Sequence, residues 1–301
     1  MMSETIRIFV GTDRSQLLAV KVLEHSIKRH TQLDIQVIPM LDLPVKQPND
    51  PKNYKRTGFS FSRFCIPKLA NYNGKAIYMD ADMLVRKDIS ALWNIPIDNA
   101  KIIIQEDIPP EHQESQKLGA PGKRIKQCAV MILDCSKLEW EIDSIIDDLN
   151  QDKYDYEMLM YELCILDEAN DIKFSVPFRW NSLEYYDQDT CLIHYTDMAT
   201  QPWVFSGNPY GDIWLDELRI MINNGTLTWK EVEQEIELGY FRPSLIRELK
   251  FGQYVPKRLQ TIFSQMNNFL DKLSHFKPHK EVYQLKKIRE TAINRQKQLI
   301  A

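Results

Sequence analysis

The sequence predicts an α/β fold in which a mixed sheet is flanked by helices, and three features of the chain support this prediction. An apolar segment at residues 6–13 is followed by apolar residues at helical spacing over 16–30 and by a second strand-like segment at 35–41. A further buried strand at 76–79 stops abruptly at two carboxylates. A strand, a helix and a strand in succession begin a parallel sheet, whose ligands gather at the carboxyl ends of the strands.

The other elements follow from the same periodicities. Pro and Lys residues indicate a loop at 42–57, and residues 111–124 read as a long excursion with Gly and Pro at its hinges, of the kind that covers ligands. Apolar runs predict strands at 101–107, 128–134 and 190–196. Helical spacing predicts helices at 59–74, 136–150 and 154–164, and from residue 214 onward.

Composition and charge describe a globular chain with two unlike parts. The 301 residues are 44% hydrophobic and 27% charged, which excludes global disorder, and the formal net charge is −4. Residues 241–301 hold thirteen basic and four acidic side chains, whereas residues 1–240 hold 25 basic and 38 acidic ones. We therefore expect a main domain at 1–240 and a basic helical extension at 241–301 with its own anionic partner. The acidic main domain argues against nucleic acid as that partner.

The cysteines and the N-terminal segment favour a cytoplasmic protein. The five cysteines are scattered and form no Cys-x-x-Cys pair, which favours reduced thiols over disulfides or a zinc site. The first residues lack a basic segment followed by a long apolar run, so we expect no signal peptide. No run of roughly 18 apolar residues predicts a membrane-spanning helix.

Asp80 and Asp82 form a D-x-D triplet at the end of the central strand. In an extended backbone residues i and i+2 point the same way, so both carboxylates can face one site while the small Ala81 leaves the main chain accessible. Two hard oxygen ligands predict a divalent-metal site. A surface turn with two solvated acids is the alternative, and the triplet alone does not decide between them.

Other polar residues stand near strand ends. Gly11, Thr12 and Asp13 end the first strand in a segment that matches neither a dinucleotide fingerprint nor a P-loop. Arg63 stands among aromatic residues, where it either faces solvent or bridges a carboxylate or a phosphate. His194 ends a late apolar strand, where a hydrogen-bonded core imidazole is the alternative to a ligand.

The order of these features resembles that of the retaining family-eight glycosyltransferases, the group of glycogenin and the bacterial lipopolysaccharide galactosyltransferases. The resemblance spans residues 6–203 and joins the first strand, an arginine in a helix, the D-x-D and a late histidine followed by Pro-Trp. It implies the GT-A fold, the Rossmann-like fold of nucleotide-diphospho-sugar transferases. It also implies that Asp80, Asp82 and His194 bind Mn²⁺ or Mg²⁺, of which Mn²⁺ better tolerates mixed oxygen and nitrogen ligands.

The resemblance also assigns roles to further residues. VGTDRSQ would contact the nucleoside, and the main chain of Ala81 would face the ribose. DYEMLM would bring a carboxylate near the sugar, with Asp155 the first candidate for the catalytic group and Glu157 the second. The arginine of FSRFCIPKL would approach the donor, and the glutamine of QCAVMILD would precede a strand of the site. The asparagine of PFRWNSL would lie near the acceptor side. The implied donor-binding set is Val10, Gly11, Thr12, Asp13, Gln16, Arg63, Asp80, Ala81, Gln127 and Asn181.

Two departures from the family pattern matter. Gln127 stands where the family strand usually has Asn. The family ending His-x-x-Gly-x-x-Lys-Pro-Trp is here one residue longer and lacks both the Gly and the Lys. That Lys normally contacts the diphosphate, so we expect Arg63 or a loop residue, Lys123, Arg124 or Lys126, to replace it.

The implied activity is metal-dependent transfer of a sugar, with retention at the anomeric carbon, to an acceptor hydroxyl. Uridine is the usual base in the family, so a UDP-sugar is the expected donor, and the acceptor is a glycan, a lipid-linked molecule or a small molecule. The metal would neutralise charge on the leaving diphosphate. Whether Asp155 attacks the sugar or only stabilises positive charge on it stays open.

The basic extension has two interpretations. It is either a helical appendage with a solvated basic face or an interfacial segment on an anionic membrane. A similar basic tail in galactosyltransferases of the resembled family favours the membrane. The protein would then be cytoplasmic and peripheral at the inner face of a membrane.

Other functional classes fit the sequence less well. A D-x-D phosphatase of the haloacid-dehalogenase type has Thr or Val where this chain has Leu84. A sugar nucleotidyltransferase needs a Gly-rich first loop, where GTDRSQ has one glycine. A non-catalytic protein that binds anionic surfaces through its extension is a third alternative. Dependence on a nucleotide sugar separates all three from a glycosyltransferase.

Overall fold

The larger of two β-sheets forms the centre of the fold. A computed structural model describes residues 5–115 and 126–300, and in it six strands follow the order β2-β1-β3-β6-β5-β7. Parallel pairs join β1 to β2 and β3, and β5 to β7, while β6 runs antiparallel to β3 and β5. The strands are Ile6–Gly11 (β1), Ile35–Met40 (β2), Lys75–Asp80 (β3), Ile102–Gln105 (β5), Val130–Asp134 (β6) and Ile172–Val176 (β7). The predicted mixed sheet is confirmed.

A smaller sheet begins where the central strand of the larger one ends. It has the order β4-β9-β8, with β4 at Met83–Val85, β9 at Leu192–His194 and β8 at Ser182–Leu183. The chain leaves β3 at Asp80 and enters β4 at Met83, so the D-x-D triplet lies in the junction between the sheets. In the antiparallel pair of β4 and β9, Met83 is the partner of His194.

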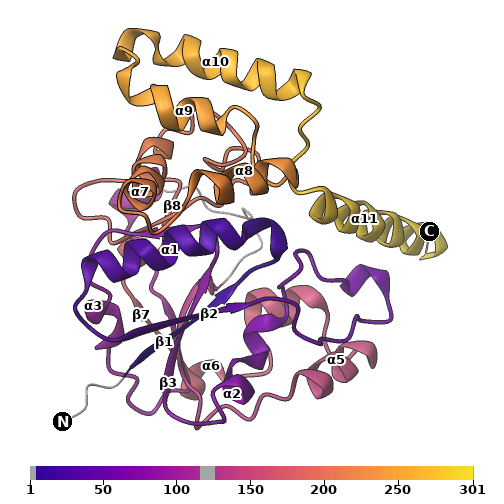
Figure 1. Ribbon diagram of the computed structural model, residues 1–301. Helices are drawn as coiled ribbons and strands as arrows, with labels where there is room; N and C mark the ends of the chain where they lie inside the picture. Colours follow the sequence, from indigo (N-terminus) through magenta and orange to yellow (C-terminus); the bar gives the residue numbers. More distant parts are fainter. Residues whose placement is uncertain (1–4, 116–125, 301) are drawn as a thin grey trace.

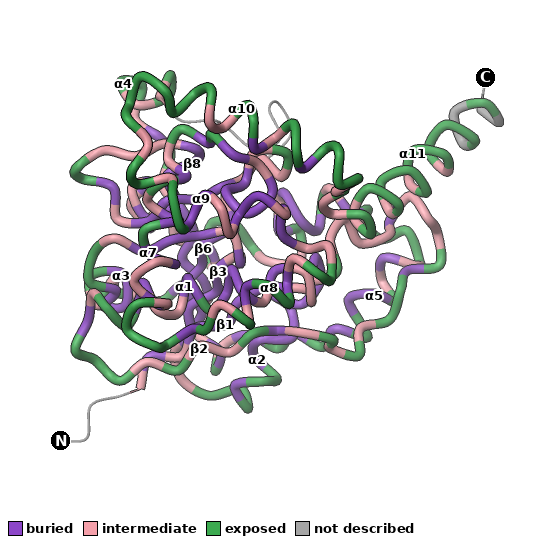
Figure 2. The backbone as a smooth tube through the Cα atoms, turned by 45° about the horizontal axis from the view of Figure 1, so that its top comes forward, coloured by how far each residue is buried: buried purple, intermediate pink, exposed green. Residues whose placement is uncertain are grey.

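Side chains alternate across β1 and β3, which gives the larger sheet a core on each face. Phe9 and Tyr78 belong to one cluster, and Ile8 and Ile77 belong to the other. The first cluster includes residues of α2 (Ile66–Leu69) and α5 (Ile142–Asn150), and the second includes residues of α1 (Leu17–His30) and α3 (Ser90–Trp93). Figure 1 shows α1 across the sheet, and Figure 2 shows the strands among the most buried parts of the chain.

A third core joins the smaller sheet to the helices that follow it. Trp203, Trp214 and Phe241 are almost fully buried there, and their rings contact one another. The helices of this second half are α7 (Gly211–Asn223), α8 (Trp229–Glu237), α9 (Leu245–Phe251), α10 (Lys257–Leu273) and α11 (Lys280–Ile300), and two short ones before them are α4 (Pro110–Gln113) and α6 (Glu168–Asp171). A capping box of Thr228 and Glu231 begins α8.

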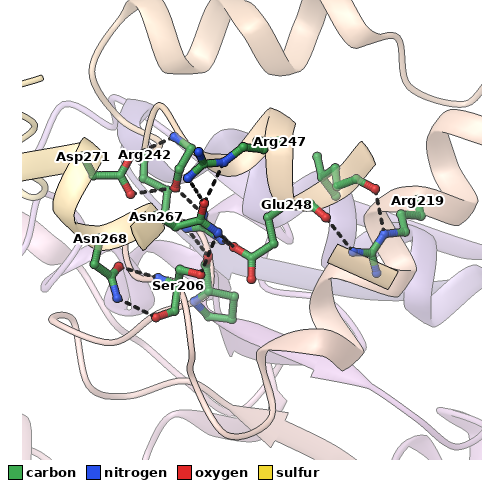
Figure 3. Close-up of polar contacts among 11 residues, drawn as sticks. Ser206, Arg219, Arg242, Arg247, Glu248, Asn267, Asn268 and Asp271 are labelled. Carbon is green, nitrogen blue, oxygen red and sulfur yellow. Dashed lines mark hydrogen bonds and ion pairs between the residues drawn. The ribbon is translucent and has the colours of Figure 1, made fainter. Parts of the chain in front are cut away.

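A buried polar network fixes α9 and α10 to the rest of the protein (Figure 3). The Arg242 guanidinium, fully buried, forms an ion pair with Glu248 and donates to the Pro202 carbonyl at 3.1 Å. Asp271 of α10 accepts hydrogen bonds of 2.7 Å from both the backbone NH and the hydroxyl of Ser244. Burial lowers the pKa of Arg242, although Glu248 opposes this shift. The segment after residue 240 is therefore held by specific contacts and not only by helical propensity.

The outer faces of α10 and α11 are mostly exposed (Figure 2). Figure 1 shows α10 on the outer side of α9. Helix α11 lies apart from both, on the side of the loop that follows β2. There α11 packs against a 3₁₀ turn at Pro51–Asn53. None of the helices formed by residues 5–115 and 126–300 combines the length and hydropathy that a bilayer crossing needs.

Three predicted helices are shorter or less regular than expected. The helix predicted at 136–150 begins only at Ile142. Residues 59–74 form a 3₁₀ turn at Ser62–Cys65 and the single turn of α2, because Pro67 restricts the start of that turn and Asn71 and Tyr72 end it with positive φ angles. Residues 154–164 contain a π-helical turn at Met158–Glu162. Such turns occur often at functional sites.

Candidate active site

Asp80, Asp82 and His194 meet at the junction of the two sheets. One ligand atom from each lies within 4.8 Å of the others. The His194 Nε2 atom is 3.1 Å from the nearer carboxylate oxygen of Asp82 and 4.0 Å from that of Asp80. The triplet that the sequence left open between a metal site and a solvated turn therefore forms a compact, partly buried cluster with the histidine.

The side-chain amides of Asn181 and Gln105, both buried, set the orientation of the His194 ring. The Asn181 amide nitrogen donates to the Gln105 side-chain oxygen at 2.6 Å, which leaves the Asn181 oxygen facing His194 Nδ1 at 2.7 Å. That oxygen can only accept, so Nδ1 carries a proton. Nε2 then presents its lone pair toward Asp80 and Asp82 in the neutral ring, which is the arrangement of a metal-binding histidine with an outer partner.

The donor set fits a divalent cation. Nε2 of the neutral His194 ring and the Asp82 carboxylate are both acceptors, and they face each other at 3.1 Å. A cation between them satisfies both, as would a second proton on the ring. Two carboxylates and one imidazole suit Mn²⁺ or another first-row divalent ion. The cluster is thus a candidate divalent-metal site, and the identity of the ion is not fixed by these contacts.

Arg63 and Tyr78 support Asp80. The Tyr78 hydroxyl donates to Asp80 at 2.5 Å, and an Arg63 nitrogen lies 3.7 Å from the same carboxylate oxygen. Arg63 also donates to the Cys128 carbonyl and stacks on the Tyr78 ring. Burial raises the pKa of Asp80, while the Arg63 guanidinium acts in the opposite direction. Arg63 thus faces the acid rather than solvent.

Gln201 occupies the position before Pro-Trp where the resembled family has its lysine. It is fully buried, and its amide nitrogen donates to Asp82 at 2.9 Å and to the Tyr195 carbonyl at 3.0 Å. The neutral side chain therefore holds a metal-site carboxylate in place. It does not supply a cation for a phosphate.

The two carboxylates and the imidazole line a cavity of about 240 Å³. Its lining also includes two arginines and two tyrosines, Arg56, Arg63, Tyr156 and Tyr161. Arg56 stacks on both rings, with its guanidinium carbon 4.6 Å from the Tyr156 centroid and 5.1 Å from that of Tyr161. The cavity is thus lined by acidic groups as well as by basic and aromatic ones.

Two of the predicted nucleoside residues line a second cavity, which lies at the ends of β1 and β2. Thr12 and Asp13 line this space of about 410 Å³. Gln16 is buried, and its side-chain oxygen has no hydrogen-bond partner among the described residues. The Val10 side chain lies in the core, so only its main chain can reach a ligand. A Cβ atom at Gly11 would lie 2.5 Å from the Tyr78 hydroxyl, so only glycine fits there.

The remaining predicted residues have different surroundings. Asp155 is exposed and accepts a hydrogen bond from the Met158 backbone, whereas Glu157 pairs with Arg56 at 3.1 Å. The main chain of Ala81 lies in the junction, with its side chain in the core. Gln127 directly precedes Cys128 and Ala129, which line the metal cavity.

Of the proposed lysine substitutes, two lie outside the described residues and one is already paired. Lys123 and Arg124 fall in the stretch 116–125. Lys126 is buried, donates to the Glu162 carbonyl at 2.7 Å and pairs with Glu168 at 2.7 Å. It is therefore held by protein groups.

Sequence reasoning missed three contributors to the site, namely Arg56, Tyr78 and Gln201. Tyr78 had a usable signal, because it precedes Asp80 by two residues in a strand and so projects to the same side of the sheet. Gln201 could have been found from its position before Pro-Trp. Arg56 lies in the loop 42–57, where no periodicity indicates direction.

The sequence of this chain is similar to those of known proteins. Residues 6–138 match the family described as "Glycosyl transferase family 8". The chain is 27% identical over 231 residues to "Protein CDI" of Arabidopsis thaliana, which covers 70% of this chain and 85% of that protein.

Among solved structures, the glycosyltransferase GlyE of Streptococcus pneumoniae TIGR4 shares 12% identity at a TM-score of 0.51, covering 81% of this chain and 66% of GlyE. The WbbM bifunctional glycosyltransferase shares 14% identity at a TM-score of 0.50, covering 71% of this chain. This chain spans about half of WbbM, 49% of its length. These similarities confirm the predicted GT-A fold.

Proposed function

We propose that this chain is a family-eight glycosyltransferase that transfers a sugar from a UDP-sugar to an acceptor hydroxyl with the aid of a divalent ion at Asp80, Asp82 and His194. The observation that supports this most directly is the pair of acceptors, Nε2 of His194 and the Asp82 carboxylate, that face each other at 3.1 Å. A divalent ion bound there would stabilise the negative charge that develops on the leaving diphosphate.

The proposal gives this chain's own residues distinct tasks. Asn181 holds the imidazole so that Nε2 faces the cluster, and Gln201 holds Asp82. Thr12 and Asp13 would contact the nucleoside in the cavity that they line. Retention at the anomeric carbon needs a group that stabilises positive charge on the sugar. Glu157 is a better placed candidate than the exposed Asp155, because it pairs with Arg56 at the cavity wall.

A screen of nucleotide sugars with Mn²⁺ tests the proposed activity. Nucleoside diphosphate release and transfer to added glycans or lipid-linked sugars are the measured quantities. We expect release with one UDP-sugar, its loss on addition of EDTA and its recovery with excess Mn²⁺, because the carboxylates cannot hold the diphosphate without a cation. Metal-independent release, or no release with any nucleotide sugar, would contradict the proposal.

We also propose that residues 241–301 bind an anionic membrane surface, near which a lipid-linked acceptor would lie. The support is the apolar stripe on α10, where Ile262, Met266, Phe269 and Leu273 are 45–61% exposed at helical spacing in a segment of high positive charge.

Liposome flotation tests this second proposal. The wild-type protein is expected to float with vesicles that contain phosphatidylserine. Phe269→Asp is expected to reduce the bound fraction severalfold, because it places a charge in the exposed apolar stripe that would enter the membrane. Leu33→Asp makes the same change at an exposed leucine outside residues 241–301 and serves as the control. Equal flotation of both variants would contradict a role for α10.

A further inference from the structure

A cavity of about 350 Å³ lies between the start of α7, the end of α9 and helix α10. It is lined by residues of three segments, 202–215, 242–252 and 260–268. No residue of this lining also lines the metal cavity or the cavity at the ends of β1 and β2. This space, called the α10 cavity below, is therefore separate from the site described above.

Helix α10 turns its polar residues toward the protein. Asn267 and Asp271 are the buried residues of this helix, and Ser264 and Asn268 are half-buried. The apolar stripe of α10 described above lies on the opposite, exposed face. Surface helices usually bury the apolar face instead. Because polar groups in an interior are normally hydrogen-bonded, the space beside the inner face of α10 favours a polar ligand.

Glu248 offers this cavity a hydrogen-bond acceptor. The residue is 7% exposed and lines the cavity. Its Oε2 atom pairs with Arg242 and contacts the Asn267 amide nitrogen at 3.5 Å. Its Oε1 atom accepts no hydrogen bond from residues 5–115 and 126–300, and Figure 3 shows it turned away from Arg242 and Asn267. A nearly buried carboxylate with one such oxygen favours a ligand that donates a hydrogen bond.

Four further side chains bring hydroxyl and amide groups to the cavity from α10. They line it and form no side-chain hydrogen bond within the part of the chain that the structure describes, and they are Gln260, Thr261, Ser264 and Gln265. Amides and hydroxyls both donate and accept, so the lining can match a ligand that does the same.

The charge and size of the cavity narrow the class of ligand. Two acids, Asp212 and Glu248, line it with one base, Arg242, which is already paired with Glu248. This excess of negative charge disfavours phosphates and carboxylates. Phe205 and Phe263 add apolar surface, and the volume falls within the range of small-molecule sites, roughly 300–1,000 Å³. A sugar ring combines neutral hydroxyls that donate and accept with apolar C–H faces.

We propose that the α10 cavity binds a neutral sugar, whose hydroxyls bond to Glu248 Oε1 and to the amides of Gln260 and Gln265. This site goes beyond the proposed sugar transfer, because it contains none of the residues assigned to the metal or to the nucleoside. The sugar belongs either to a free glycan or to the headgroup of a glycolipid, since both present the same hydroxyls. Such a site holds the protein on a glycosylated molecule without taking part in the chemistry.

Titration calorimetry on the full-length protein tests the proposal with the methyl glycosides of glucose, galactose, mannose and N-acetylglucosamine. Binding of at least one is expected without Mn²⁺ or nucleotide. Gln260→Ala combined with Gln265→Ala is expected to weaken this binding by roughly 5- to 100-fold, because two hydrogen bonds are lost. Both side chains are exposed and bond to no other residue that the structure describes, so the variant should fold normally, and thermal unfolding checks this.

Vesicle flotation separates the two sources of the sugar. Phosphatidylcholine vesicles with galactosyl-diacylglycerol are compared with vesicles of phosphatidylcholine alone, so that anionic lipid is absent from both. Binding of a methyl glycoside supports a free glycan as the ligand. Flotation that requires the glycolipid, by a protein that binds no free glycoside, supports the headgroup. The Gln260→Ala and Gln265→Ala double variant is expected to reduce whichever signal is observed.

Gln234→Ala combined with Gln253→Ala is the matched control, because both residues are exposed glutamines outside the lining of the cavity. Its binding is expected to equal that of the wild-type protein. No binding in either arm, or equal losses in the two double variants, would overturn the inference. Stronger binding of glucose 6-phosphate or of putrescine than of every neutral glycoside would also overturn it. An inactive wild-type protein that still binds the sugar overturns the proposed function alone, whereas an active one that binds no sugar in either arm overturns only this inference.

Discussion

Replacement of Asp82 by asparagine is expected to lower kcat/KM for sugar transfer by roughly a hundred- to a thousandfold, the scale for losing a preorganised electrostatic contact. The asparagine oxygen can still accept from Gln201, whose nitrogen lies 2.9 Å from the carboxylate, so the local structure should persist. What is lost is the negative charge that faces His194 Nε2 and would hold a divalent ion. Steady-state kinetics over a range of Mn²⁺ concentrations measures the effect.

Asp216→Asn provides the control for this substitution. Asp216 lies on α7, its side chain is 66% exposed, and it pairs with Arg219 away from the metal cluster. Its kcat/KM and metal dependence should match those of the wild-type protein. Wild-type activity and wild-type dependence on Mn²⁺ in Asp82→Asn would show that this acid is no ligand.

Replacement of Arg242 by alanine is expected to lower the free energy of unfolding by about 3–5 kcal/mol, the usual loss when one partner of a buried ion pair is removed. Arg242 is 0% exposed, so the Glu248 carboxylate would be left without its charge partner in the interior. The donors to the Pro202 carbonyl and to the Ser244 hydroxyl would be lost as well. Chemical denaturation monitored by tryptophan fluorescence reports the change, because Trp203 and Trp214 lie in the same core.

Two further variants separate the ion pair from general effects of losing an arginine. Arg258→Ala, at the exposed start of α10, is expected to change the free energy of unfolding by less than about 0.5 kcal/mol. Arg242→Met combined with Glu248→Leu removes both charges and is expected to recover most of the loss. If Arg242→Ala is as stable as Arg258→Ala, then the network of Figure 3 does not stabilise the fold.

The sequence was sufficient for five of the six strands of the larger sheet and for the two carboxylates at the end of β3. Long apolar runs predicted β1, β3, β5 and β6, and the period of two placed Asp80 and Asp82 on one side of the chain. His194 joined them only through the family resemblance, since a histidine at the end of an apolar strand has no intrinsic partner. Residues 6–138, which contain Asp80 and Asp82 but not His194, match the family model and so agree with that resemblance.

The parts that could not be predicted depend on short elements or on tertiary contacts. β4 and β8 have three and two residues, too few for any periodicity, and the edge strand β7 carries polar residues that obscured its pattern. No local sequence pattern predicts the hydrogen bond between Asn181 and His194, because the two residues belong to different elements. The position of α11 depends on how the chain returns from α10, which amphipathic spacing alone cannot specify.

The pairing of β1 with β3 fixes the distance between two parts of the site. Gly11 is the partner of Asp80 in this parallel register, so the strand end at the nucleoside cavity and the strand end at the metal cluster are neighbours about 4.8 Å apart. This distance is set by the backbone hydrogen bonds between the strands and not by any loop. Residues of the loop at 42–57 line both cavities, so under the proposed function a change in its length would alter the space around the donor, while the separation of the two strand ends stays constant.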